Sequence, residues 1–111
     1  MDKGEKKMKP KKHYIKNKKH LEIQKYLVVS TVHITEEEDE YLHDDVYSQL
    51  SVYTTDYGHS IFVPHENLKE FEGMVGKNVL SLLKIAKKNG CCYLKLDRDG
   101  FIYEDLPQFD W

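Results

Sequence analysis

The feature that most restricts what this chain can fold into is the separation of its charges along the sequence. Residues 1–20 contain nine lysines and two acidic residues, a net charge of +7, whereas residues 21–111 contain eight basic and seventeen acidic residues, a net charge of −9. A lysine-rich segment with so few apolar side chains cannot bury enough surface to offset the entropy of ordering. We therefore predict a disordered basic arm over 1–20 and a single domain over 21–111, large enough for one modest core.

Hydrophobic periodicity within 21–111 alternates between the patterns of strands and helices. A β-branched run at 27–34 predicts a buried strand, and the capping box from Thr35 to Glu38 predicts a short helix over about 35–44. A wide apolar stripe predicts a second helix over 77–88. Further strands are predicted at 49–54, 61–63, 91–96 and 101–103.

The predicted element order is β-α-β-β-α-β-β, which is typical of an α+β protein. Strands joined as hairpins, with helices between them, favour a two-layer sandwich. We expect a mainly antiparallel sheet of about five strands with two helices on one face. The segment Asp97 to Gly100 is interpreted as a hairpin turn, with a positive φ supplied at Asp99-Gly100.

Few residues suggest catalysis. Thr31 and His33 share one face of the first predicted strand, but side chains two residues apart lie ~6–7 Å from each other, too far for a direct hydrogen bond. A buried structural histidine is the favoured interpretation of His33, and no catalytic residue is assigned. A small hydrolase-like enzyme that uses Thr31, His33, Asp97 and Asp99 stays open as the alternative. His59 lies beside a predicted turn and is expected to be solvated.

No metal or cofactor is predicted. The six histidines show no metal-binding spacing. The adjacent Cys91 and Cys92 lack the second ligand pair of a zinc site and cannot close a useful disulfide loop, which fits a reducing, cytoplasmic compartment. The longest apolar runs, such as 26–29, are far shorter than the ~20 residues that cross a bilayer, so no membrane partner is expected.

The two charged parts predict two kinds of partner. Flexible lysines bind nucleic acid weakly and without sequence reading, through counterion release. The predicted contacts are Lys6, Lys7, Lys9, Lys11, Lys12, Lys16, Lys18 and Lys19. The acidic domain is expected to engage a protein partner of unknown identity. Its predicted contacts are Glu36, Glu37, Glu40, Asp44 and Asp45. Mimicry of nucleic-acid phosphates and a merely solvated surface are alternatives for these carboxylates.

Tyrosine is unusually frequent, with eight in the chain. An aromatic sheet face that stacks bases is one interpretation. However, the net negative charge of the domain disfavours phosphates, so packing in the core and at interfaces is the preferred account. The tyrosines concerned are Tyr41, Tyr47, Tyr53, Tyr57, Tyr93 and Tyr103.

Short motifs follow one another along the domain: Ser30-Thr31-Val32-His33-Ile34-Thr35, Asp56-Tyr57-Gly58, Asn89-Gly90-Cys91, Leu96-Asp97-Arg98-Asp99-Gly100, and Leu106-Pro107 before Trp111. Together they resemble a family of small uncharacterised proteins carried by bacterial plasmids and phages. The resemblance spans roughly 27–111 and leaves out the lysine arm. It implies a compact accessory protein of a mobile element and transfers no catalytic residues; where the family often has an aromatic after Gly-Cys, this chain has Cys92. The expected function is therefore that of a non-enzymatic accessory or regulatory binding protein.

Overall fold

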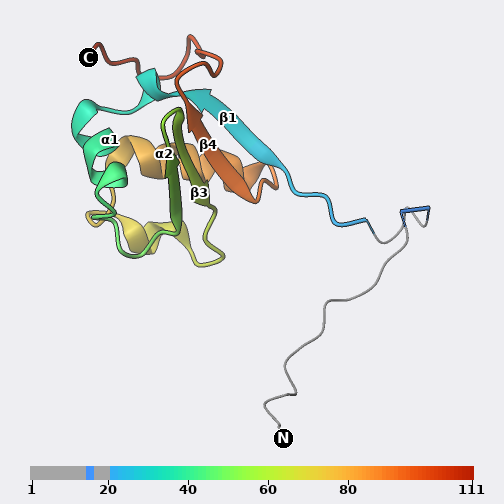
Figure 1. Ribbon diagram of the computed structural model, residues 1–111. Helices are drawn as coiled ribbons and strands as arrows, with labels where there is room; N and C mark the ends of the chain where they lie inside the picture. Colours follow the sequence, from blue (N-terminus) through green and yellow to red (C-terminus); the bar gives the residue numbers. More distant parts are fainter. Residues whose placement is uncertain (1–14, 17–20) are drawn as a thin grey trace, which may run out of the picture.

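The computed structural model describes residues 15–16 and 21–111 (Figure 1). Most of the predicted basic arm, residues 1–14 and 17–20, lies outside the described residues, and its disorder stays a prediction. Within the described ranges, no helix is long and apolar enough to span a membrane.

The described part of the chain is an α+β fold with two α-helices and one four-stranded sheet (Figure 1). The elements in order are β1 Tyr26–Ser30, the 3₁₀ helix η2 Thr31–His33, α1 Glu36–His43, β2 Val52–Thr55, β3 Gly58–Phe62, the 3₁₀ helix η3 Leu68–Phe71, α2 Lys77–Lys88 and β4 Tyr93–Asp97. In the sheet they lie in the order β1-β4-β3-β2, with β1 parallel to β4 and the other pairs antiparallel. The sheet is therefore mixed.

A fifth strand over 101–103 was expected, and this prediction is wrong. A turn does follow β4, since the Gly100 N–H donates to the Asp97 carbonyl at 2.9 Å, but it leads into no further strand and is therefore not a hairpin turn. β4 already pairs with β1 on one side and β3 on the other, so no edge of β4 is free for a further strand. The chain crosses the end of β1 instead. There the Phe101 carbonyl accepts one hydrogen bond from the Ser30 N–H at 2.9 Å.

The expected positive φ at Asp99-Gly100 is also wrong, because the described residues with positive φ lie elsewhere in the chain. Glycine is required at position 100 for a different reason. A Cβ atom there would lie 2.7 Å from the carbonyl carbon of Val29, closer than side chains approach backbone. Close contact with β1, rather than turn geometry, therefore restricts this position.

The first strand is shorter than the predicted 27–34. It ends at Ser30, whose Oγ accepts from the Val32 N–H at 3.2 Å and begins η2. Thr31 and His33 therefore lie in a helical turn and do not share one face of a strand. The turn directs the His33 ring into the interior, where the side chain is 2% exposed.

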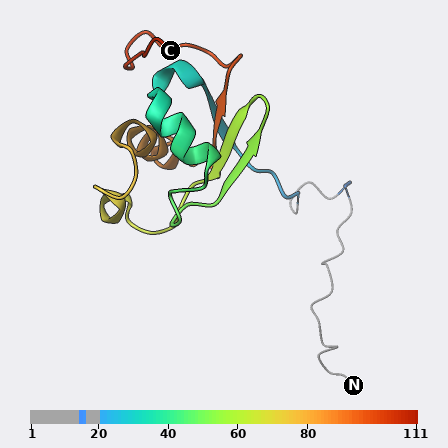
Figure 2. The same cartoon turned by 60° about the vertical axis from the view of Figure 1, so that its left-hand side comes forward.

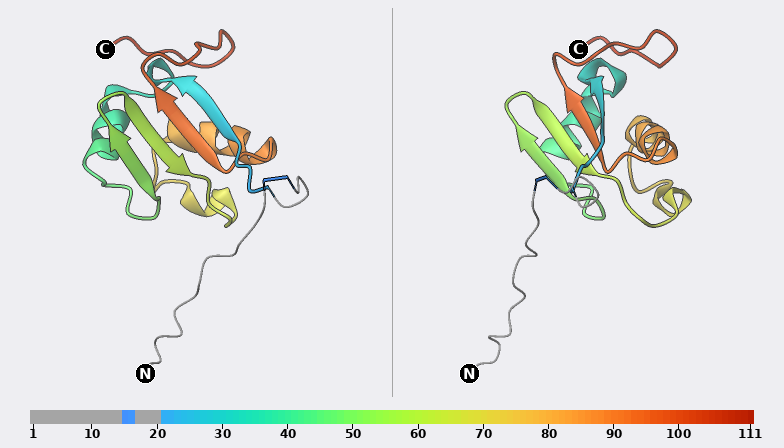
Figure 3. Two further views of the ribbon diagram at one scale, coloured as in Figure 1. Left: turned by 45° about the vertical axis from the view of Figure 1, so that its right-hand side comes forward. Right: turned by 90° about the vertical axis from the view of Figure 1, so that its right-hand side faces the viewer.

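Both α-helices lie on the same face of the sheet (Figures 2 and 3). The buried core includes residues of both helices and of the strands. α2 has the predicted bounds, and the strands place alternate side chains inward. The largest completely buried apolar side chains are Ile34, Leu42, Ile61, Leu83, Leu94 and Leu96.

Glu38 joins the beginnings of the two helices. Its Oε1 accepts from the Thr35 N–H at 2.9 Å, which completes the predicted capping box. Its Oε2 accepts from the Asn78 N–H at 2.9 Å, in the first turn of α2. A Cβ at position 76 would collide with this carboxylate, so Gly76 allows the approach. One buried carboxylate thus satisfies free N–H groups of two helices and faces the positive ends of both dipoles.

Candidate functional site

His33 holds the C-terminal segment instead of facing a cleft. Its Nε2 lies 2.9 Å from the backbone nitrogen of Tyr103, and its Nδ1 lies 2.8 Å from the carbonyl oxygen of Pro107. A backbone N–H can only donate, so Nε2 accepts and the neutral ring carries its proton on Nδ1. Both ring nitrogens are engaged, and neither is free to take a proton from Thr31.

The Asp97 carboxylate is part of the turn after β4. Its Oδ1 accepts from the Asp99 N–H at 2.8 Å, and its Oδ2 lies 3.8 Å from Nζ of Lys95. The bond from the Asp99 N–H is typical of an Asx turn, so the Asp97 side chain stabilises the turn.

The predicted acidic contacts lie together on and just after α1. Glu36, Glu37, Glu40 and Asp44 follow one another at helical spacing and, like Asp45, are exposed. We call these five residues the acidic surface. Beside it, the Tyr41 hydroxyl donates to Oε2 of Glu37 at 3.1 Å, and this contact raises the pKa of Tyr41. Of the predicted lysine contacts only Lys16, which is exposed, lies within the described residues.

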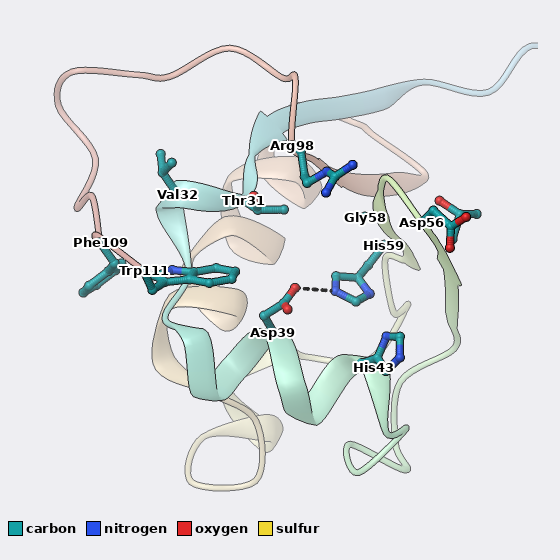
Figure 4. Close-up of a pocket in the computed structure, with 11 residues that line it drawn as sticks. Thr31, Val32, Asp39, His43, Asp56, Gly58, His59, Arg98, Phe109 and Trp111 are labelled. Atoms are coloured by element: carbon teal, nitrogen blue, oxygen red, sulfur yellow. Dashed lines mark hydrogen bonds and ion pairs between the residues drawn. The ribbon is translucent and has the colours of Figure 1, made fainter.

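His59 is not solvated as expected, because it is 4% exposed and forms two hydrogen bonds. Its Nε2 lies 2.8 Å from Oδ1 of Asp39 in α1 (Figure 4). Its Nδ1 lies 2.8 Å from Oγ1 of Thr54 in β2. A carboxylate that accepts from Nε2–H leaves Nδ1 to accept from the hydroxyl. The same order of groups activates nucleophiles in some enzymes. Here, however, these hydrogen bonds connect α1 to the β2–β3 hairpin. Thr54 does not line the neighbouring cavity, so its hydroxyl does not face a ligand there.

A cavity of about 540 Å³ lies beside His59 (Figure 4). It is located where the parallel strands β1 and β4 both end, and α1, the β2–β3 hairpin and the C-terminal segment also contribute to its wall. Its polar and aromatic lining includes Asp39, His43, Asp56, Arg98 and Trp111. Among the described residues, no cluster of histidine, cysteine or acidic side chains is arranged to hold a metal ion.

The face of the sheet opposite the helices carries a row of aromatic side chains. Tyr26 and Tyr93 are register partners in β1 and β4, and their rings stack with centroids 4.8 Å apart and planes 16° apart. Phe62 of β3 meets the Tyr93 ring edge-on at 5.5 Å. Tyr26 is 48% exposed and Phe62 is 36% exposed. We call Tyr26, Tyr93 and Phe62 the aromatic row. Both α-helices lie on the other face of the sheet (Figure 3).

Beside the aromatic row, the next row of paired residues on this face crosses all four strands. It consists of Val28, Lys95, Ser60 and Tyr53. Tyr53 is 71% exposed. The expected packing of tyrosines in the core is confirmed for Tyr47, which is buried, whereas for the exposed Tyr53 packing at an interface stays a prediction. Burial raises the pKa of the Tyr47 phenol.

Charge is distributed unevenly between the two layers. The acidic surface belongs to α1, in the helix layer, whereas the open sheet face carries Lys95, with Asp97 next to it at the end of β4. Lys25 precedes Tyr26, and its Nζ donates to the Asn89 carbonyl at 2.8 Å. The net negative charge of the domain therefore does not describe the surface around the aromatic row.

These features define a small α+β domain with one helix-covered and one open sheet face. The chain belongs to a family of unknown function, DUF5983, whose C-terminal domain matches residues 26–111. The match begins at Tyr26, the first residue of β1, and confirms membership of an uncharacterised family. No curated protein and no solved structure matches the chain. The origin from a plasmid or phage stays a prediction.

Proposed function

We propose that this chain is a non-enzymatic binding protein that holds single-stranded nucleic acid on the open face of its sheet. The observation that carries the proposal is the aromatic row, in which Tyr26 and Tyr93 stack on each other at the surface. Contiguous exposed apolar surface often marks a binding site.

Stacking favours a single strand over a duplex. Bases in a single strand can separate and present their faces to aromatic side chains, and each stacked base contributes about 1–3 kcal/mol. Tyr93 is the centre of the row because it contacts both Tyr26 and Phe62. Because every base has a π face, we expect little sequence preference.

Positive charge supports the same ligand. The segment with nine lysines, residues 1–20, comes five residues before β1 in the sequence, and Lys95 lies in the register row next to the aromatic row. The acidic surface belongs to the helix layer, so a strand on the sheet face avoids most of its repulsion. Lysine contacts to phosphates release counterions, and binding should therefore weaken steeply with salt.

The proposal also includes the predicted protein partner, the accessory role and the cytoplasmic location. A basic protein partner on the acidic surface would not compete with a strand on the opposite face. The resemblance of its motifs to proteins carried by plasmids and phages supports an accessory role in a mobile element. A reducing, cytoplasmic location is supported by the two free thiols of Cys91 and Cys92.

Replacing Tyr93 by alanine should weaken the binding of a short pyrimidine oligonucleotide by about tenfold or more, since the central stacking surface is lost. Fluorescence anisotropy of the labelled oligonucleotide at low salt measures this affinity. The matched control is Tyr41→Ala, which removes an exposed tyrosine from α1 and should leave the affinity unchanged. Equal affinities of the Tyr93→Ala and Tyr41→Ala variants, or a preference for duplex, would contradict the proposal.

A further inference from the structure

We propose that the cavity beside His59 is a second binding site, separate from the sheet face, and that its ligand is a nucleoside monophosphate. The cavity volume of about 540 Å³ lies within the usual range of small-molecule sites. Ligands of open sheets commonly bind outside the carboxyl ends of parallel strands, and both β1 and β4 end here.

Trp111 provides a fixed aromatic wall. Its indole N–H donates to the Ile34 carbonyl at 3.0 Å, and the Phe109 N–H donates to the Val32 carbonyl at 2.8 Å. These bonds hold the end of the chain against η2, while Trp111 is still 50% exposed. The ring is therefore positioned before any ligand arrives and can stack on a planar base.

Arg98 provides the cation for a phosphate. It is the only arginine of the chain, and its guanidinium lies 6.0 Å from the centre of the Tyr57 ring. It forms no ion pair with any residue that the structure describes. A guanidinium presents its N–H groups in a fork that matches two phosphate oxygens, and Arg98 has these donors available.

Carboxylates and an imidazole complete the lining. Asp39 gives one oxygen to His59, and its side chain is 30% exposed, so its second oxygen is accessible to a ligand. Asp56 and His43 border the same space (Figure 4). Carboxylates accept hydrogen bonds from hydroxyl groups but repel phosphate, so they fit the sugar while Arg98 fits the phosphate.

Trp111 is the only tryptophan in the chain, so tryptophan fluorescence comes from an indole that lines this cavity. Titration of the full-length protein with UMP, CMP, AMP and GMP should give a saturable change, with half-saturation below about 1 mM for at least one of them. Arg98→Gln should weaken this binding by about tenfold. Lys84→Gln removes an equal charge from α2, outside the cavity, and should leave the binding unchanged.

Three further titrations distinguish this site from simpler ones. Uridine and inorganic phosphate should each bind at least about tenfold more weakly than UMP, because each makes only part of the contacts. The Tyr93→Ala variant should retain nucleotide binding, since the aromatic row lies on the other face of the sheet. The proposal is overturned by an absent response to all four nucleotides, by equal affinity for uridine or phosphate, or by a response that depends on Tyr93 and not on Arg98.

Discussion

Replacing Glu38 by alanine is expected to lower the free energy of unfolding by about 2–4 kcal/mol, one of the largest effects of any single change in this domain. The carboxylate is 5% exposed and accepts hydrogen bonds from Thr35 in its own cap and from Asn78 in α2. Alanine leaves these partly buried donors without an acceptor, and it removes the carboxylate from the N-termini of both helices. Urea unfolding followed by circular dichroism measures the difference.

Two further variants separate capping from general effects of charge. Glu40→Ala removes an exposed carboxylate of the same helix and should change stability by no more than about 0.5 kcal/mol. Glu38→Gln retains one acceptor oxygen, so we expect a loss between those of the two alanine variants. If Glu38→Ala and Glu40→Ala were equally stable, the joint capping of α1 and α2 would be wrong.

Replacing His33 by alanine is also expected to cost about 2–4 kcal/mol, through a buried void and two broken hydrogen bonds. The imidazole fixes the backbone at Tyr103 and Pro107, and these bonds hold the segment that ends at Trp111. Loss of the ring should therefore release this segment. The expected signs are a lower midpoint in urea and a red shift of the Trp111 emission as the indole becomes hydrated.

The matched control for His33 is His43→Ala, which removes an exposed imidazole from the end of α1. Its stability should stay within about 0.5 kcal/mol of the unchanged protein. A His33→Ala protein with unchanged stability and emission would mean that the C-terminal segment is held by its other contacts alone.

Local patterns in the sequence predicted the local structure well. The apolar stripe of α2, the capping box at Thr35 and the hairpin turn at Asp56 are each complete within a few residues. The fold also contains a parallel pairing of β1 with β4, whose strands are far apart in the sequence. No local pattern encodes that pairing, and the hairpin signal at Asp97 therefore produced the wrong fifth strand.

The candidate sites were harder to predict for the same reason. The partners of His59 come from α1 and β2, and the rings of Tyr26 and Tyr93 meet only because β1 lies beside β4. One signal was present: aromatic residues occupy the side of β1, β3 and β4 that alternates with their buried leucines, valine and isoleucine. The net negative charge of the whole domain argued against nucleic-acid binding by these aromatic residues. However, the acidic residues of α1 belong to the opposite layer.

The most direct test of the central claim is to map the binding surface by amide chemical-shift changes in isotope-labelled, full-length protein titrated with a single-stranded oligonucleotide. The proposed function predicts that the largest changes cluster around Tyr26, Phe62, Tyr93 and Lys95, on the open sheet face. Changes centred on the acidic surface of α1, or no change at low salt, would contradict it.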